Sequence, residues 1–249
     1  ATPGAEGPDS VSVWLPKEKV LFTGDLFGHM FPMWPNLTTI RGERHRFVMP
    51  YIDSLDRVLE LEPEIIVPSH FYPVHGKEVI RAGVTRIRDA VTFVHDAVVR
   101  GINEGKDVYT LMREIQLPPD LQISEGHGKV SWGVRSIWEG YNGWFHMKSA
   151  TEMYPVPASD VYADLVSAAG GPAAVAKLAQ AKLQEDKAVE ALHLSEVALE
   201  AAPDSEPALR VQLATYERLL EQSADENHYE VFWLRDLIAQ SRERLGISE

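Results

Sequence analysis

The sequence contains no cysteine among its 249 residues. Disulfide bonds, thiolate nucleophiles and cysteine metal ligands are therefore excluded, and cytoplasm and periplasm both stay open as compartments. Long apolar runs are lacking too: no stretch approaches the ~20 residues that cross a bilayer, so no membrane span is predicted. A hydrophobic share of 45% and a charged share of 24% are typical of a globular protein with a buried core.

Positive charge is scarce. The chain has 24 lysines and arginines against 37 aspartates and glutamates, a formal net charge of −13. A surface this acidic repels phosphate backbones. The charge balance therefore argues against nucleic acid as a partner.

The first third of the chain has the pattern of a mixed α/β fold. Short runs rich in β-branched and aromatic residues alternate with one stretch of helical periodicity. The pattern predicts a hairpin, then a helix that stops before Pro63, then a buried strand. These lie at 11–15 with 19–23, at about 51–61, and at 64–68.

From about residue 84 the pattern becomes helical. One apolar stripe runs from Val84 to Ile102, and another from Val108 to Ile115. Five further helices are expected at about 159–169, 171–183, 184–202, 205–223 and 226–245. Two antiparallel pairs among them resemble tetratricopeptide hairpins in period, and such repeats commonly serve as surfaces for another chain.

The predicted strands of the first third have too few neighbours. A sheet of three strands with one helix would leave Val11, Val13, Leu15, Val20 and Phe22 poorly buried. The sequence also starts without methionine, in what looks like the middle of a motif. We therefore expect the sheet to be completed by a longer N-terminus or by a separately supplied piece of the same protein.

Two polar pairs, Gly24-Asp25 and Ser69-His70, each follow a predicted strand. Loops at strand ends are where α/β folds build sites. A carboxylate and an imidazole are ligands that zinc and similar dications prefer. Glu6, in a turn before the hairpin, could add a third ligand. Two plainer interpretations stay open, namely that Asp25 is a turn residue and that His70 is a structural histidine.

The motifs of this region occur in a set order: Thr2-Pro-Gly4, the hairpin, Phe22-Thr-Gly-Asp25, the helix, Ile66-Val-Pro-Ser-His70 and Pro73-Val-His-Gly76. This order resembles the C-terminal half of the metallo-β-lactamase fold, an αββα sandwich that holds two metal ions. That family takes its first ligands from a His-x-His-x-Asp-His motif, which this sequence lacks. The resemblance implies that Asp25 bridges two metals, that Glu6 and His70 each hold one, and that the remaining ligands lie upstream of Ala1.

The second half carries Glu139-Gly-Tyr-Asn-Gly-Trp-Phe145, then Ala201-Ala-Pro-Asp204 and Glu230-Val-Phe-Trp-Leu234. These stretches resemble the dimerisation domain of the zinc alkylsulfatases. That family also uses a glutamate, matching Glu6, where most of the superfamily uses histidine. The resemblance implies that residues 1–105 belong to an α/β lactamase-type catalytic domain, and that residues 106–249 form an all-α, tetratricopeptide-like dimerisation domain.

Two further positions follow from the resemblance. Asn36 and Arg41 lie in a stretch similar to the one whose asparagine and arginine hold the sulfate oxygens in alkylsulfatases. A planar guanidinium donates two parallel hydrogen bonds to a tetrahedral oxyanion. For Arg41 we weigh this role evenly against that of a solvated loop arginine.

The sequence also departs from the alkylsulfatases. They carry glutamate at the position of Asp25, although aspartate is usual in the wider superfamily. By spacing, their histidine and tyrosine near the sulfate correspond to Trp132 and Trp144 here. An indole cannot act as a general acid, so the metal centre is better supported than the sulfatase chemistry around it.

The resemblance predicts a metal-dependent hydrolase with two zinc ions in each complete site, in which Asp25 positions the activated water. The expected substrate is a small anionic ester, a sulfate ester with an alkyl or other apolar tail. The expected protein partners are the N-terminal half of the same protein and a second copy, which makes a homodimer through the helical half. Two alternatives remain: another lactamase-fold hydrolase acting on a thioester, lactone or related ester, and a non-catalytic helical dimerisation module with a degenerate metal site.

Overall fold

The computed structural model describes residues 1–4, 7–27, 30–37 and 46–247. The chain divides into two compact units, Ala1–His146 and Met147–Glu249, which are described separately. The boundary predicted between residues 105 and 106 separates a lactamase-type domain from a dimerisation domain. It stays a prediction.

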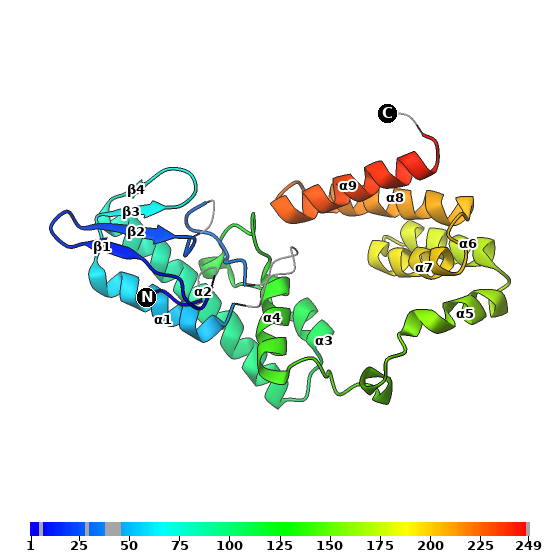
Figure 1. Cartoon of the computed structure of the whole chain (residues 1–249), viewed down its shortest axis with the longest axis horizontal. Coiled ribbons are helices and arrows are strands. Elements are labelled where there is room, and N and C mark those ends of the chain that lie inside the picture. Colours follow the sequence, from blue (N-terminus) through cyan, green and yellow to red (C-terminus); the bar gives the residue numbers. More distant parts are fainter. Residues whose placement is uncertain (5–6, 28–29, 38–45, 248–249) are drawn as a thin grey trace. The chain divides into compact units, whose positions relative to one another are not determined.

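The first unit contains a four-stranded mixed sheet (Figure 1). Its strands are β1 (Val13–Leu15), β2 (Val20–Gly24), β3 (Ile65–Pro68) and β4 (Val74–His75), in that spatial order. The β1–β2 pair is the predicted hairpin, and β3 is the predicted strand. β2 and β3 run parallel, whereas β3 and β4 are antiparallel. The two-residue β4 has no counterpart among the predicted elements.

Helices cover one face of this sheet. The helices α1 (Val48–Leu61) and α2 (Lys77–Asn103) pack there (Figure 1). Because successive strand residues point to opposite faces, Leu21 and Ile66 are buried beneath these helices whereas Phe22 is exposed.

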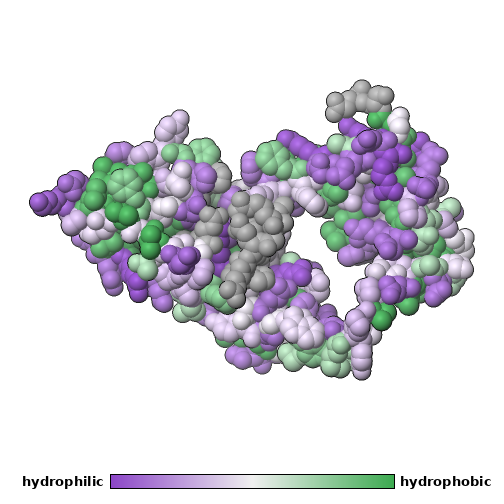
Figure 2. All heavy atoms as spheres, viewed as in Figure 1, coloured by the Kyte–Doolittle hydropathy of each residue, from purple (hydrophilic) through white to green (hydrophobic). Residues whose placement is uncertain are grey.

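The other face of the sheet is bare and apolar. Val13, Leu15 and Phe22 are exposed there, and Figure 2 shows an apolar patch over β1 and β2. The expectation that these strands leave an apolar face poorly buried is confirmed in the part of the chain that the structure describes.

The rest of the first unit is helical. It adds α3 (Val108–Glu114), the short 3-10 turn η1 (Pro119–Leu121) and α4 (Val130–Asn142). Close packing depends on small residues: a Cβ at Gly133 would lie 2.7 Å from the buried Trp34 ring, and one at Gly101 would lie 2.3 Å from Leu111. The first contact holds α4 against the segment between β2 and α1, and the second holds α2 against α3.

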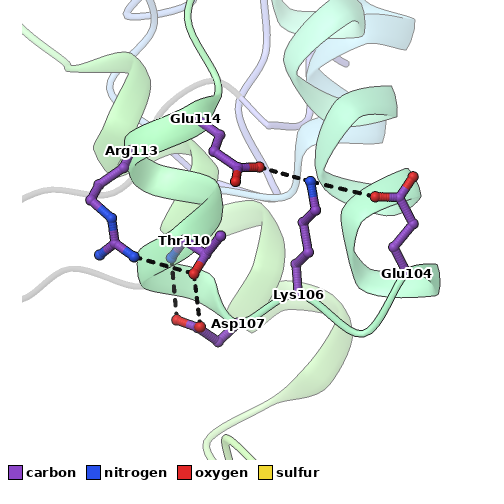
Figure 3. A network of polar contacts seen from close by, with 6 residues as sticks. All are labelled: Glu104, Lys106, Asp107, Thr110, Arg113 and Glu114. Carbon is purple, nitrogen blue, oxygen red and sulfur yellow. Dashed lines mark hydrogen bonds and ion pairs between the residues drawn. The ribbon is translucent and has the colours of Figure 1, made fainter.

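A polar network fixes the turn between α2 and α3 (Figure 3). The Asp107 carboxylate accepts hydrogen bonds from two backbone N–H groups in the first turn of α3, at 3.0 and 3.2 Å. Lys106 donates to Glu114 at 2.8 Å and lies 3.5 Å from Glu104. The hydrogen bond to Glu114 and the nearby negative charge raise the pKa of Lys106.

The second unit is an array of antiparallel helices. Two 3-10 turns, η2 (Ala150–Met153) and η3 (Ala158–Val161), precede α5 (Tyr162–Ala168), α6 (Pro172–Gln184), α7 (Ala188–Ala201), α8 (Glu206–Gln222) and α9 (His228–Arg244). The five predicted helices are confirmed, with small shifts at their ends. Buried alanines such as Ala179 and Ala198 let the helices approach closely. In the described part of the chain, no helix is both long enough and apolar enough to cross a membrane.

Candidate metal and anion site

The ends of β2 and β3 meet at one edge of the sheet. Gly24 pairs with Pro68, and the Ser69 N–H donates to the Gly24 carbonyl at 3.2 Å. Because the two strands are parallel, the residues that follow them emerge side by side. This register brings Asp25 next to His70.

Asp25 and His70 are within contact distance. The Asp25 Oδ1 and His70 Nε2 atoms are 3.4 Å apart, and Ser69 Oγ donates a hydrogen bond to the same carboxylate oxygen. About a third of the Asp25 side chain and half of the His70 side chain are exposed. The pair therefore forms an accessible carboxylate–imidazole cluster at the sheet edge, with Ser69 orienting the carboxylate.

Glu6 and Arg41 lie outside the described residues, and so do their contacts. The turn that leads to Glu6 is described as far as Gly4, whose φ of 86° and contact with α1 admit no side chain: a Cβ would lie 2.5 Å from Tyr51 N. Within the described ranges, no group of three or more histidine, aspartate or glutamate side chains could hold a metal ion. The structure therefore brings two of the three predicted ligands together and leaves the third untested.

Asn36 is buried, with 3% of its surface exposed. Neither its amide nitrogen nor its amide oxygen has a hydrogen-bond partner among the residues that the structure describes. Leaving a buried polar atom unpaired costs roughly 1–3 kcal/mol, so nearly all such atoms in proteins are paired. An amide kept in this state is well suited to receive a polar ligand.

The loop before α4 packs directly on Asn36. A Cβ at Gly128 would lie 2.5 Å from the Pro35 carbonyl oxygen and 2.9 Å from the Asn36 Cα. A side chain at this position would clash with Pro35 and Asn36, and His127 and Lys129 flank the contact in the sequence. We did not single these two residues out from the sequence, although the glycine-flanked stretch Gly126-His-Gly-Lys129 is a visible signal.

The tryptophans at the predicted sulfate-contacting positions differ in environment. Trp132 is half-buried in the first turn of α4, with Lys129 Nζ 6.0 Å from its ring centroid. Trp144 lies beyond the end of α4 and is 73% exposed. Neither indole ring can act as a general acid, because its N–H does not ionise in the accessible pH range.

A second histidine cluster links α2 to α4. His95 Nδ1 lies 2.8 Å from Asp96 Oδ1, and His95 Nε2 lies 2.7 Å from the Tyr141 hydroxyl. A pocket of about 260 Å³ opens beside Tyr141, lined also by Phe47, Met49 and Ile137. The sequence pattern did not identify this cluster, because its partners are 46 residues apart.

Two family models match the chain. Residues 108–236 match the model described as alkyl sulfatase dimerisation, and residues 2–70 match the metallo-beta-lactamase superfamily. The first match covers about half of the chain.

Curated relatives have similar descriptions. A linear primary-alkylsulfatase from Pseudomonas is 31% identical over 172 residues, covering 67% of this chain and 32% of that protein. An (R)-specific secondary-alkylsulfatase from Pseudomonas is 26% identical over 88% of this chain and 34% of its own length. An alkyl/aryl-sulfatase from Saccharomyces cerevisiae is 26% identical over 70% of this chain and 27% of its own length. The chain spans about a third of the length of these relatives.

A solved structure extends the similarity to the whole chain. The stereoselective inverting sec-alkylsulfatase from Pseudomonas superposes with a TM-score of 0.86 at 25% identity. The match covers 99% of this chain and 39% of that one.

Proposed function

The chain belongs to the alkylsulfatase family within the metallo-beta-lactamase superfamily, and from this premise we propose that it forms part of a metal-dependent hydrolase of sulfate esters with an alkyl or other apolar tail. The observation that carries the proposal is the convergence of Asp25 and His70 at the ends of two parallel strands, 3.4 Å apart.

The donor set fits a dication. A carboxylate and an imidazole match zinc in ligand type, and Ser69 holds the carboxylate in position. In the proposed site Asp25, His70 and Glu6 would hold the metal ions, with the Asp25 carboxylate shared between two of them. Since zinc usually takes about four ligands, the others would come from outside the described residues. When bound, such ions lower the pKa of a water to near neutrality and so provide the hydroxide nucleophile.

The chain's own residues bind and orient the anionic head. Asn36 offers a buried amide whose desolvation is already complete, so a sulfate oxygen would gain a hydrogen bond without displacing an internal partner. Arg41 is proposed to hold two further oxygens through its planar guanidinium. Lys129 follows Gly128 in the sequence and is proposed to add positive charge for the anion.

We also propose that the protein works as a homodimer. The support is the family model itself, which is described as a dimerisation domain and covers residues 108–236. Repeated helical hairpins of this kind present broad surfaces to other chains.

Metal content and sulfate release test the proposal together. We expect the complete protein, including the segments that supply the other ligands, to contain zinc and to release sulfate from alkyl sulfates. Asp25→Asn and His70→Ala should each lower metal content and reduce sulfate release by at least about a hundredfold, the scale of losing one activated nucleophile. Glu18→Gln, in the hairpin turn at the opposite end of β2 from Asp25, is the matched control and should change neither.

The same assay separates the alternatives. Zinc binding with cleavage of thioesters or lactones, but not of sulfate esters, would replace the proposed substrate. A protein without bound metal and without hydrolysis of any ester in the panel would overturn the catalytic proposal.

A further inference from the structure

The pocket beside Tyr141 lies between the start of α1 and the end of α4, within the first compact unit. Its walls are mostly apolar and include Phe47, Met49, Pro50, Ile137, Gly140 and Tyr141. Three of these side chains stay accessible: Phe47 is 55% exposed, Met49 43% and Tyr141 55%. Large apolar side chains gathered around one hollow mark a binding site for an apolar ligand.

Tyr141 is a fixed wall of this pocket although it is exposed. Its hydroxyl oxygen lies 2.7 Å from His95 Nε2, and His95 Nδ1 lies 2.8 Å from Asp96 Oδ1. An ionised carboxylate only accepts hydrogen bonds, so Nδ1 carries the hydrogen, and in the neutral imidazole Nε2 accepts one from the tyrosine hydroxyl. These hydrogen bonds anchor the ring to α2, so the wall is formed before any ligand binds and the cost of ordering it on binding is small.

The pocket adjoins Asn36 through the next residue in the chain. The Leu37 carbonyl oxygen accepts a hydrogen bond from Ser136 Oγ at 3.1 Å and another from the Arg46 N–H at 2.9 Å. Ser136 and Arg46 both line the pocket. A ligand in the pocket would therefore lie close to the amide that is proposed to contact the anion.

We propose that this pocket binds an alkyl chain. Among the described residues that line it, Arg46 is the one charged residue, so a chain of methylene groups would desolvate little polar surface on entering. A water molecule takes up ~30 Å³ in the liquid and a methylene group about as much, so the volume of about 260 Å³ suits a chain of on the order of eight carbons. Bulkier ligands require the larger pockets of ~300–1,000 Å³ that are usual for drug-sized molecules.

A series of 1-alkanols tests the pocket directly. Binding is measured by calorimetric titration of the complete protein with no sulfate ester present, so the result does not depend on hydrolysis. From 1-butanol to 1-octanol the Kd should fall by about fourfold for each added methylene group. At 1-decanol it should level off, because the pocket is full at about eight carbons. Absence of binding, or a Kd that does not depend on chain length, would overturn the proposal.

Gly140 offers a way to fill the pocket. It lines the pocket, and a Cβ placed on it would have no atom within 4 Å. Leucine would take the space of about four methylene groups, so Gly140→Leu should raise the Kd of 1-octanol by at least about tenfold. Glu60→Leu, which adds the same side chain at an exposed position near the other end of α1, is the control and should stay within about twofold.

Circular dichroism establishes that each variant is folded. If Gly140→Leu is not folded, Met49→Gln takes its place, because it makes an exposed wall of the pocket polar, and it should raise the Kd of 1-octanol by about fivefold or more. Unchanged binding of 1-octanol in the folded variant contradicts the assignment of the alkyl chain to this pocket.

Competition identifies the source of the chain. If the pocket takes the tail of an ester whose anionic head contacts Asn36, octyl sulfate displaces 1-octanol, and Gly140→Leu raises the KM for octyl sulfate but not for ethyl sulfate. If it takes a separate neutral amphiphile, 1-octanol binds equally well at saturating octyl sulfate. Both results support the alkyl-chain pocket. A protein that binds 1-octanol as expected but releases no sulfate contradicts the hydrolase proposal alone, whereas sulfate release without binding of 1-octanol contradicts the pocket alone.

Discussion

Asn36 is buried at a cost in stability. Its amide is buried, yet no partner for it exists among the described residues. Asn227 is equally buried, but its side-chain oxygen accepts a hydrogen bond from Glu230 N at 3.1 Å and so caps α9. The same side chain therefore lowers the free energy of unfolding at position 36 and raises it at position 227.

Replacing Asn36 with leucine therefore has an unusual expected result. Asn36→Leu removes an unpaired buried amide and keeps the volume, so we expect the free energy of unfolding to rise, by about 1 kcal/mol. The KM for a sulfate ester should rise at the same time, by about tenfold or more, through loss of the ligand's hydrogen bond. Denaturant titration and steady-state kinetics measure the two effects.

Asn227→Leu is the matched control. It removes a cap and strands a backbone N–H, so it should lower the free energy of unfolding by about 1 kcal/mol or more without changing KM. If Asn36→Leu destabilised the protein to the same degree, the amide would have a partner that this interpretation lacks.

At the scale of one element, α4 carries two glycines in different surroundings. At Gly133 an added Cβ would meet the Trp34 ring at 2.7 Å, whereas at Gly140 nothing lies within 4 Å. Gly133 is thus required by packing, while Gly140 only weakens the helix.

Alanine at these two positions should have opposite effects. Gly133→Ala is expected to destabilise the protein by about 1–3 kcal/mol through overpacking against Trp34. Gly140→Ala should stabilise it by roughly 0.5–1 kcal/mol, because alanine has the higher helix propensity. Thermal unfolding followed by circular dichroism would show the two midpoints moving apart, and a shift in the same direction would contradict the described position of α4.

The start of α3 gives a second prediction at this scale. Asp107→Ala removes the cap that accepts two backbone hydrogen bonds, so we expect a loss of about 1 kcal/mol. Asp107→Asn retains the acceptor oxygen and should recover most of that loss, as measured in a urea titration. Equal losses in both variants would show that charge rather than capping is responsible.

At the scale of the whole molecule, the chain has two compact units with separate hydrophobic cores. Units of this kind can unfold independently when few contacts join them. The bare apolar face of the sheet belongs to the first unit.

Calorimetry should accordingly resolve two unfolding transitions. Gly133→Ala lies in the first unit, so it should lower the midpoint of one transition by several degrees and leave the other in place. Ala191→Gly, at a buried position of α7 in the second unit, should move only the other one. A single transition that shifts as a whole in both variants would mean that the units unfold together.

Much of the fold could be predicted because its signals are local. The hairpin at β1 and β2, the stop of α1 before Pro63 and the helices of the second unit follow from side-chain periodicity and from proline and glycine positions. The two-residue β4 was missed because its pairing with β3 is a tertiary contact with almost no sequence pattern. The roles of Glu6, Asp25, Asn36, Arg41 and His70 stay predictions.

The sequence by itself determined the residue types and their order: an aspartate and a histidine after two strands, no cysteine, and apolar stripes at helical spacing. Only the tertiary structure decided that Asp25 and His70 are neighbours, because the parallel register of β2 and β3 joins residues 45 positions apart. It also decided that Asn36 is buried with its amide unpaired, while Trp144 is exposed. Burial depends on what packs around a residue from distant parts of the chain, and a local pattern does not contain that information.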